Sequence, residues 1–363
     1  MKVFKWLVHT VSHEHMSDPV SSVIPTLSSG EGNKSQPHSA LQDKSLDLYE
    51  SPTGAPTVGQ VVDTFSSRLD GSNAFRLPTL CADAGALGPF WLAAASLTGL
   101  GHLHMATTGQ DSYSFALADD GQAVICAAAD GLGSRPSSAQ IGATLLTRML
   151  CARLARLPTD GVLTSPQPSF ATALAEVNDD LCSFRHKLGL HLEDRDLSST
   201  LAFIWIPTDH RTRPSFAGRI GDCAVFTLSE SAYETIFERG EGPLNVVKAC
   251  LPRTPPLDEL ELKKLDLSTQ QAIILATDGL ADDLFNSPAV RAWLAKCWSS
   301  RCGAFRMLDA LRYRRQGSHD DRTALTVWLE PLYEQQTPLE DPGKGRTGAK
   351  APDAPPSTTT SAV

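Results

Sequence analysis

The amino-acid sequence predicts an α+β sandwich, because runs typical of antiparallel strands form blocks that are separated by pairs of helices. The clearest block is a hairpin, in which residues 112–118 and 122–129 are rich in β-forming residues and flank an Asp-Gly turn. Strands that alternate one by one with helices, as in a parallel sheet, do not describe the order of elements in this chain. The grouping therefore favours antiparallel sheets covered by helices.

The first pair of helices follows this hairpin. After a loop at 131–138, Ile141, Leu145 and Met149 recur at a spacing of four residues, which predicts a long helix with one face in the core. A second amphipathic pattern at 170–188 predicts its partner.

The second half of the chain repeats this grouping, with strands first and a helix pair before the last strand. The predicted strands are 200–206, 215–220, 224–228, 271–277 and 323–329, and the predicted helices are 287–298 and 305–314.

The two ends of the chain differ from its centre in composition. Ser, Thr, Pro and Gly dominate both ends, where apolar residues show no periodicity and cannot bury enough surface to offset ordering. We therefore expect a disordered N-terminal extension at 1–57, one domain at 87–332 and a disordered tail at 333–363. The segment 58–86 stays unassigned.

Charge and cysteine content exclude several classes of protein. The net charge of −9 has the wrong sign for a protein that follows nucleic-acid backbones. The longest apolar run, 90–100, is too short to cross a bilayer, and the apolar run near the N-terminus is broken before it could form a signal peptide. The eight cysteines are scattered without a CxxC pair, as in a reducing compartment. We expect a cytoplasmic protein without nucleic-acid or membrane partners.

Acidic residues stand at the ends of four predicted strands. Asp130 and Asp278 each follow an apolar strand within an Asp-Gly pair, Asp222 follows another strand, and the Asp320-Asp321 doublet precedes the last strand. Carboxylates that meet at one place repel each other unless a cation neutralises them, and an all-oxygen set suits Mg²⁺ or Mn²⁺. The sequence therefore predicts a two-metal site for phosphate chemistry. The other Asp-Gly pairs, at Asp70, Asp120 and Asp160, are expected to be ordinary turns.

Six short motifs occur in an order that resembles metal-dependent protein phosphatases of the 2C class, specifically their divergent bacterial branch. They are GHLHMATTGQD at 101–111, ADGLGS at 129–134, SSTL at 198–201, RIGD at 219–222, ATDGLADD at 276–283 and DDRT at 320–323. Each motif alone is weak, but six in sequence are fairly specific. The resemblance implies a four-layer α-β-β-α sandwich, with two antiparallel sheets and flanking helix pairs.

The resemblance also implies roles for single residues in a Ser/Thr phosphoprotein phosphatase. Asp130 would bridge two Mn²⁺ or Mg²⁺ ions, the carbonyl of Gly131 would bind the second ion, and Asp278 and Asp320 would hold the first. Asp111 would bind metal-coordinated water. Phosphate monoesters would be hydrolysed by attack of a metal-bridging hydroxide.

In bacterial members of the family a third ion is bound by two aspartates, and Asp222 and Asp282 stand at the matching positions. The implied partners are a phosphorylated Ser/Thr protein and a cognate kinase system.

The chain departs from the family pattern where an arginine usually binds the substrate phosphate. Ala106 and Thr107 stand there, so we expect His102 or His104 to supply the positive donor. Leu132 replaces a histidine that protonates the leaving group in some members, which leaves His319 or water for that role. The missing arginine keeps open an alternative, a catalytically weak or inactive pseudophosphatase that binds a phosphoprotein or a kinase. A haloacid-dehalogenase-type phosphatase needs an Asp-x-Asp pair at a strand end, and DGLGS lacks it.

Overall fold

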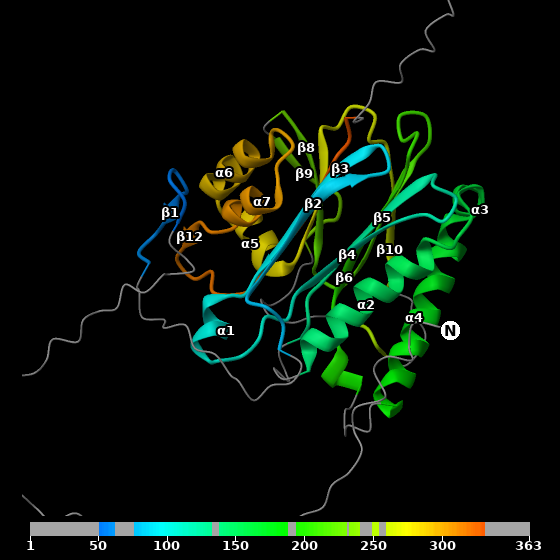
Figure 1. Cartoon of the computed structure of the whole chain (residues 1–363), viewed down its shortest axis with the longest axis horizontal. Helices are drawn as coiled ribbons and strands as arrows, with labels where there is room; N and C mark the ends of the chain where they lie inside the picture. Colours follow the sequence, from blue (N-terminus) through cyan, green and yellow to red (C-terminus); the bar gives the residue numbers. More distant parts are fainter. Residues whose placement is uncertain are drawn as a thin grey trace, which may run out of the picture. The chain divides into compact units, whose positions relative to one another are not determined.

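The computed structural model describes residues 51–61, 76–132, 138–187, 194–230, 232–239, 249–253 and 259–330. Within these residues, two antiparallel sheets are stacked and each is covered by helices on its outer face (Figure 1). All the described residues belong to one compact unit, which begins at Leu48.

The first sheet has five antiparallel strands in the order β10-β7-β6-β5-β4. Its strands are β4 (Ser112–Leu117), β5 (Ala123–Ala129), β6 (Leu201–Pro207), β7 (Ser215–Ile220) and β10 (Glu261–Leu265). Every residue of β5, β6 and β7 is buried, because helices cover one face and the second sheet covers the other. The two edge strands, β4 and β10, keep exposed residues.

The second sheet has six antiparallel strands in the order β2-β3-β13-β11-β8-β9. Its strands are β2 (Leu80–Leu87), β3 (Phe90–Leu97), β8 (Ala224–Ser229), β9 (Ala232–Thr235), β11 (Ala272–Ala276) and β13 (Arg322–Trp328). A short parallel pair, β1 (Thr57–Val58) with β12 (Arg314–Arg315), lies outside both sheets.

The helices form the two outer layers. On the five-stranded sheet lie α2 (Ala139–Leu154) and α4 (Pro166–Lys187), with α3 (Thr159–Thr164) beside α4. On the six-stranded sheet lie α5 (Asp278–Asn286), α6 (Pro288–Trp298) and α7 (Ala304–Ala310). Two short helices, α1 (Leu100–His104) and η2 (Asp194–Leu197), complete the described elements. The predicted α-β-β-α sandwich is confirmed.

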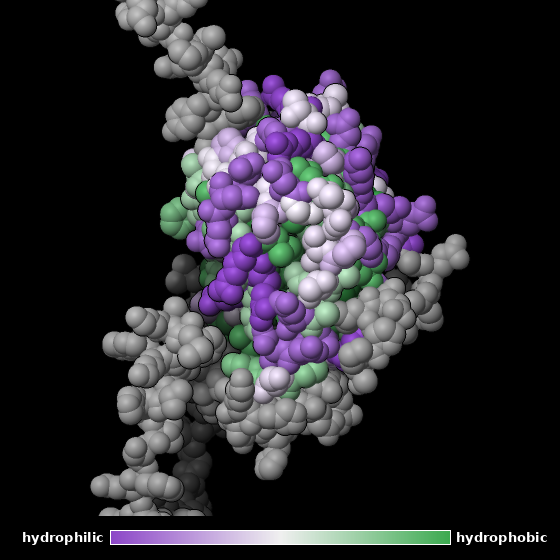
Figure 2. All heavy atoms as spheres, turned by 90° about the vertical axis from the view of Figure 1, so that its right-hand side faces the viewer, coloured by the Kyte–Doolittle hydropathy of each residue, from purple (hydrophilic) through white to green (hydrophobic). Residues whose placement is uncertain are grey.

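Three apolar clusters hold the layers together, one between the sheets and one under each helical layer. The cluster between the sheets contains Phe90, Ile204 and Val327, all fully buried. The face that carries α3 and α4 is largely hydrophilic with small apolar areas, as expected of amphipathic helices (Figure 2).

Most predicted elements match the structure, with differences of a few residues at their ends. The helix predicted at 305–314 is wrong at its end, because α7 stops at Ala310 and Arg314 already belongs to β12. The buried Arg322 guanidinium donates to the carbonyl of Leu311, the C-cap of α7, and to that of Tyr313 beyond it, and so satisfies carbonyls where the helix ends. Asp160 lies in the first turn of α3, so its expected turn is also wrong.

The six-stranded sheet begins inside the segment that the sequence left unassigned. β2 pairs with β3 along its whole length, from Leu80 opposite Leu97 to Leu87 opposite Phe90. A domain that starts at residue 87 would therefore lack an edge strand, and we propose an earlier boundary. Disorder was expected at 1–57 and at 333–363, and of these ranges the residues 1–50 and 333–363 lie outside the described residues.

Two further observations concern the expected cellular context. In the part of the chain that the structure describes, no helix combines the length and the apolar character that crossing a bilayer requires. All eight cysteines are free thiols.

Candidate metal centre

Three aspartates lie at one edge of the stacked sheets because the strands before and after them are antiparallel. Asp130 directly follows β5, and Asp278 follows β11 after one residue, Thr277, and begins α5. Since Ala276 of β11 lies opposite Ala324 of β13, the start of β13 meets the end of β11, and Asp320 precedes that start. β11 and β5 contact each other across the two sheets, so these ends lie side by side, and the charge of Asp278 helps to raise the pKa of Asp130.

Asp111 joins this group from the strand next to β5. It directly precedes β4, and Ser112 pairs with Ala129, so Asp111 lies opposite Asp130. Its Oδ2 accepts a hydrogen bond of 2.6 Å from the Thr277 hydroxyl. Its Oδ1 is buried and has no hydrogen-bond partner within the described ranges. A buried carboxylate oxygen without a donor is costly unless a cation lies beside it.

Burial and mutual repulsion raise the pKa values of all four carboxyl groups. For Asp111 and Asp130, burial is the largest cause and neighbouring aspartates add to it, so both pKa values lie well above their usual range. The same causes raise the pKa of Asp278 to about 8 and also raise the pKa of Asp320. Cations relieve such repulsion, and the all-oxygen donor set fits Mn²⁺ or Mg²⁺.

Asp222 and Asp282 lie beside these four residues. Asp222 follows β7 after Gly221, whose φ of 92° strains any residue with a Cβ. Asp282 lies one turn after Asp278 on α5, so the two side chains share a helix face. Burial raises the pKa of Asp222, and the charge of Asp282 adds to this rise. The Asp282 carboxylate also forms an ion pair of 2.8 Å with Arg239, a residue that the sequence analysis missed.

Gly131 is held against helix α2. Its backbone N–H donates to the carbonyl of Gln110 at 3.2 Å. A Cβ added to Gly131 would lie only 2.7 Å from the carbonyl oxygen of Ala139, so only glycine permits this approach. The metal-binding role of the Gly131 carbonyl stays a prediction.

Asp321, the second member of the doublet, organises the loops around the aspartates, and the sequence analysis gave it no role. Its carboxylate accepts hydrogen bonds from the backbone N–H groups of Gly99 at 2.6 Å and Gln110 at 2.5 Å, and pairs with His102 Nδ1 at 2.9 Å. Burial lowers the pKa of His102, but the hydrogen bond to Asp321 and nearby carboxylates outweigh it and raise the pKa to about 9. Ligand atoms of His102, Asp320 and Asp321 lie within 4.8 Å of one another.

The two histidines proposed to bind substrate phosphate differ in position. His102 lies in α1 next to Asp321, whereas His104 ends that helix two residues later. Residues two apart in a helix face different directions, so His104 does not share the direction of His102. Ala106, where the family usually has arginine, adopts a positive φ of 59°.

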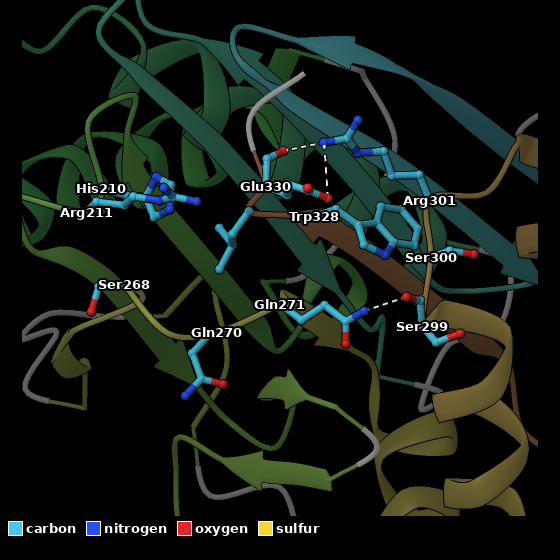
Figure 3. Close-up of a pocket in the computed structure, with 11 residues that line it drawn as sticks. His210, Arg211, Ser268, Gln270, Gln271, Ser299, Ser300, Arg301, Trp328 and Glu330 are labelled. Carbon is cyan, nitrogen blue, oxygen red and sulfur yellow. Dashed lines mark hydrogen bonds and ion pairs between the residues drawn. The ribbon is translucent and has the colours of Figure 1, made fainter. Parts of the chain in front are cut away.

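A cavity of about 510 Å³ lies at the other end of the sheets (Figure 3). Its lining includes His210, Gln271, Arg301 and Trp328, which come from separate segments. Trp328 ends β13, whereas Asp320 precedes that strand. The seven residues of β13 therefore separate the cavity from the aspartate cluster. At the usual rise per residue this distance is roughly 20 Å. The cavity is therefore distinct from the aspartate cluster.

The chain is similar to known proteins in a family sequence pattern and in its fold. The family model described as protein phosphatase 2C matches residues 98–312. Serine/threonine phosphatase Stp1 from Staphylococcus aureus is 12% identical, with a TM-score of 0.50 over 68% of this chain and 96% of that one. The serine/threonine phosphatase of S. agalactiae is 14% identical, with a TM-score of 0.49 over 69% of this chain and 100% of that one. No curated protein matches the chain.

The match to the family model spans more than half of the chain, from directly after β3 to the region after α7. The chain therefore belongs to the protein phosphatase 2C family, as the six motifs indicated. The similarity to solved structures concerns the fold.

Proposed function

We propose that this protein is a Mn²⁺- or Mg²⁺-dependent phosphatase that removes phosphate from phosphorylated Ser and Thr residues of proteins. The observation that carries the proposal is the group of four carboxylates, Asp111, Asp130, Asp278 and Asp320, whose pKa values are all raised at one sheet edge. Clustered carboxylates repel each other and destabilise a fold, and bound divalent cations relieve this repulsion. Such clusters with shifted pKa values are typical of functional sites.

Asp130, between the two sheets, would hold two ions, with Asp278 and Asp320 as further ligands and the Gly131 carbonyl completing the second ion's set. The bound ions would supply an activated water at neutral pH and would neutralise the phosphate. Asp111 would bind metal-coordinated water. The Thr277 hydroxyl holds Asp111 by its hydrogen bond to Oδ2, and the buried Oδ1 has no donor among the described residues.

His102 is the better placed of the two histidines for the substrate phosphate. Its Nδ1 is held by Asp321, and a pKa of about 9 keeps the ring positively charged at neutral pH. His319 or water remains the proposed proton donor for the leaving group. The substrate would be a phosphoprotein of a cognate kinase system, and the eight free thiols support a cytoplasmic location.

A pseudophosphatase is the second candidate, and the absence of arginine at Ala106 and Thr107 favours it. Such a protein would bind a phosphoprotein or a kinase without turnover. The two candidates differ in phosphate release alone, since both retain the fold.

Phosphate release from a phosphoserine peptide with added Mn²⁺ tests the proposal. Wild-type protein should release phosphate, and Asp130→Asn should reduce the rate by at least about a hundredfold because it removes the shared ligand. Asp120→Asn is the matched control, because Asp120 lies in a turn and bonds Gln122 and Thr159 outside the cluster. Equal rates in the wild type and Asp130→Asn would contradict the site assignment.

A further inference from the structure

Arg239 lies directly beside the candidate metal centre and is held there by three contacts with α5. Its Nη2 donates to Asp282 Oδ1 at 2.8 Å, and its Nη1 donates to Asn286 Oδ1 at 3.1 Å. The guanidinium also lies over the Phe285 ring, 5.5 Å from its centre. The three partners lie within five consecutive residues of one helix, so α5 holds the guanidinium in one position.

The Asp282 carboxylate, which pairs with Arg239, interacts electrostatically with the aspartate cluster. The charge of Asp282 contributes to the raised pKa values of Asp222, Asp278 and Asp320. Asp222 and Asp282 are also the two residues expected to hold a third ion. A guanidinium on Asp282 therefore brings one positive charge to the place where that ion would bind.

We propose that Arg239 takes the place of the third cation, so that the full chain binds two divalent ions readily and a third ion only in competition with Arg239. This inference rests on the proposed metal centre and concerns how many ions that centre holds. Competition arises because the guanidinium occupies the Oδ1 side of the Asp282 carboxylate, and because an ion bound there would bring two positive charges together.

The expected strength of this competition follows from exposure. The side chains of Arg239 and Asp282 are 39% and 48% exposed, so their ion pair is screened by water. An exposed ion pair and an exposed cation–π contact each change an equilibrium by only a few fold. Together they should weaken third-ion binding by about tenfold.

Equilibrium dialysis of metal-free full-length protein against Mn²⁺, with the free ion counted by electron paramagnetic resonance, measures the number of bound ions. Wild-type protein should bind two ions, with a third only at much higher Mn²⁺. Arg239→Gln should bind the third ion about tenfold more tightly. Adding Asp282→Asn to Arg239→Gln should abolish this gain.

Arg213→Gln is the matched control. Arg213 forms an ion pair of 2.9 Å with Asp209, and these side chains are 37% and 48% exposed, nearly as in the Arg239 pair. Its ion binding should equal that of the wild type. Unchanged third-ion affinity in Arg239→Gln, or three ions bound with similar affinity in the wild type, would overturn the inference while leaving the metal centre intact. If neither the wild type nor any of the variants binds Mn²⁺, the inference and the proposed function fail together.

Discussion

Replacing Asp278 by asparagine should stabilise the metal-free protein, although Asp278 begins a helix. Burial and the charges of neighbouring aspartates raise the pKa of Asp278 to about 8, so the folded state holds a proton that the unfolded state has lost at neutral pH. The folded state binds more protons, and its stability therefore falls as the pH rises from about 4 to about 8. Asparagine carries no charge and escapes this loss.

The size of the effect follows from the two pKa values. Each unit between the ordinary pKa of 3.8 and the working pH costs about 1.4 kcal/mol, which gives at most about 4 kcal/mol at pH 7. The negative charge at the start of α5 gains only about 0.3–1 kcal/mol from the helix dipole. The cost that burial and repulsion impose on the charged form is larger, so Asp278→Asn should gain about 2–4 kcal/mol at pH 7 and clearly less at pH 5.

Urea unfolding in EDTA at pH 5 and pH 7 measures this difference. With Mn²⁺ at 100 times its dissociation constant, the wild type should gain roughly 2.7 kcal/mol, and the variant should gain less because a ligand is missing. Asp120→Asn is a control that should change the stability in the opposite direction. Hydrogen bonds from Thr159 and Gln122 lower the pKa of Asp120, so its replacement should destabilise the protein at pH 7. A metal-free Asp278→Asn protein less stable than the wild type at pH 7 would refute the reasoning.

Three further predictions concern the surroundings of the cluster. Thr277→Val should lower the free energy of unfolding by about 1–3 kcal/mol, because it removes the donor to Asp111 and the acceptor of the Thr323 N–H; unchanged urea unfolding would contradict this. Asp321→Asn should lower the pKa of His102 from about 9 towards 6.5, and an NMR titration that still gives about 9 would show that Asp321 is not the cause. A chain that begins at residue 87 should aggregate because it lacks β2 and exposes the edge of β3, whereas one that begins at Leu48 should stay monodisperse in gel filtration.

The sequence predicted Asp130, Asp222, Asp278 and Asp320 of the candidate site because each stands at one end of an apolar strand, whereas Asp111 and Asp282 followed only from the resemblance to the 2C phosphatases. Asp130 and Asp278 follow short apolar runs typical of buried strands, and antiparallel pairing brings such ends to a common edge. The layered fold was predictable for a similar reason, since blocks of strands need helices to cover their outer faces.

Other features depend on tertiary structure that no local pattern encodes. Asp320 and Asp321 are identical neighbours, and only the packed loops decide that Asp321 accepts the N–H groups of Gly99 and Gln110. Arg239 is 43 residues before Asp282, in a segment without periodicity, so its ion pair gave no signal. The strand β3 was missed because both of its faces are covered, which leaves an unbroken apolar run in place of alternation.

We propose that the aspartate cluster binds divalent cations in order to hydrolyse phosphate esters. The most direct measurement follows phosphate release from a phosphoserine peptide while Mn²⁺ is titrated into metal-free protein whose melting temperature is recorded in the same samples. We predict that release is absent without metal and rises together with the melting temperature. A melting temperature that rises with Mn²⁺ while no phosphate is released would contradict the claim and identify a metal-binding pseudophosphatase.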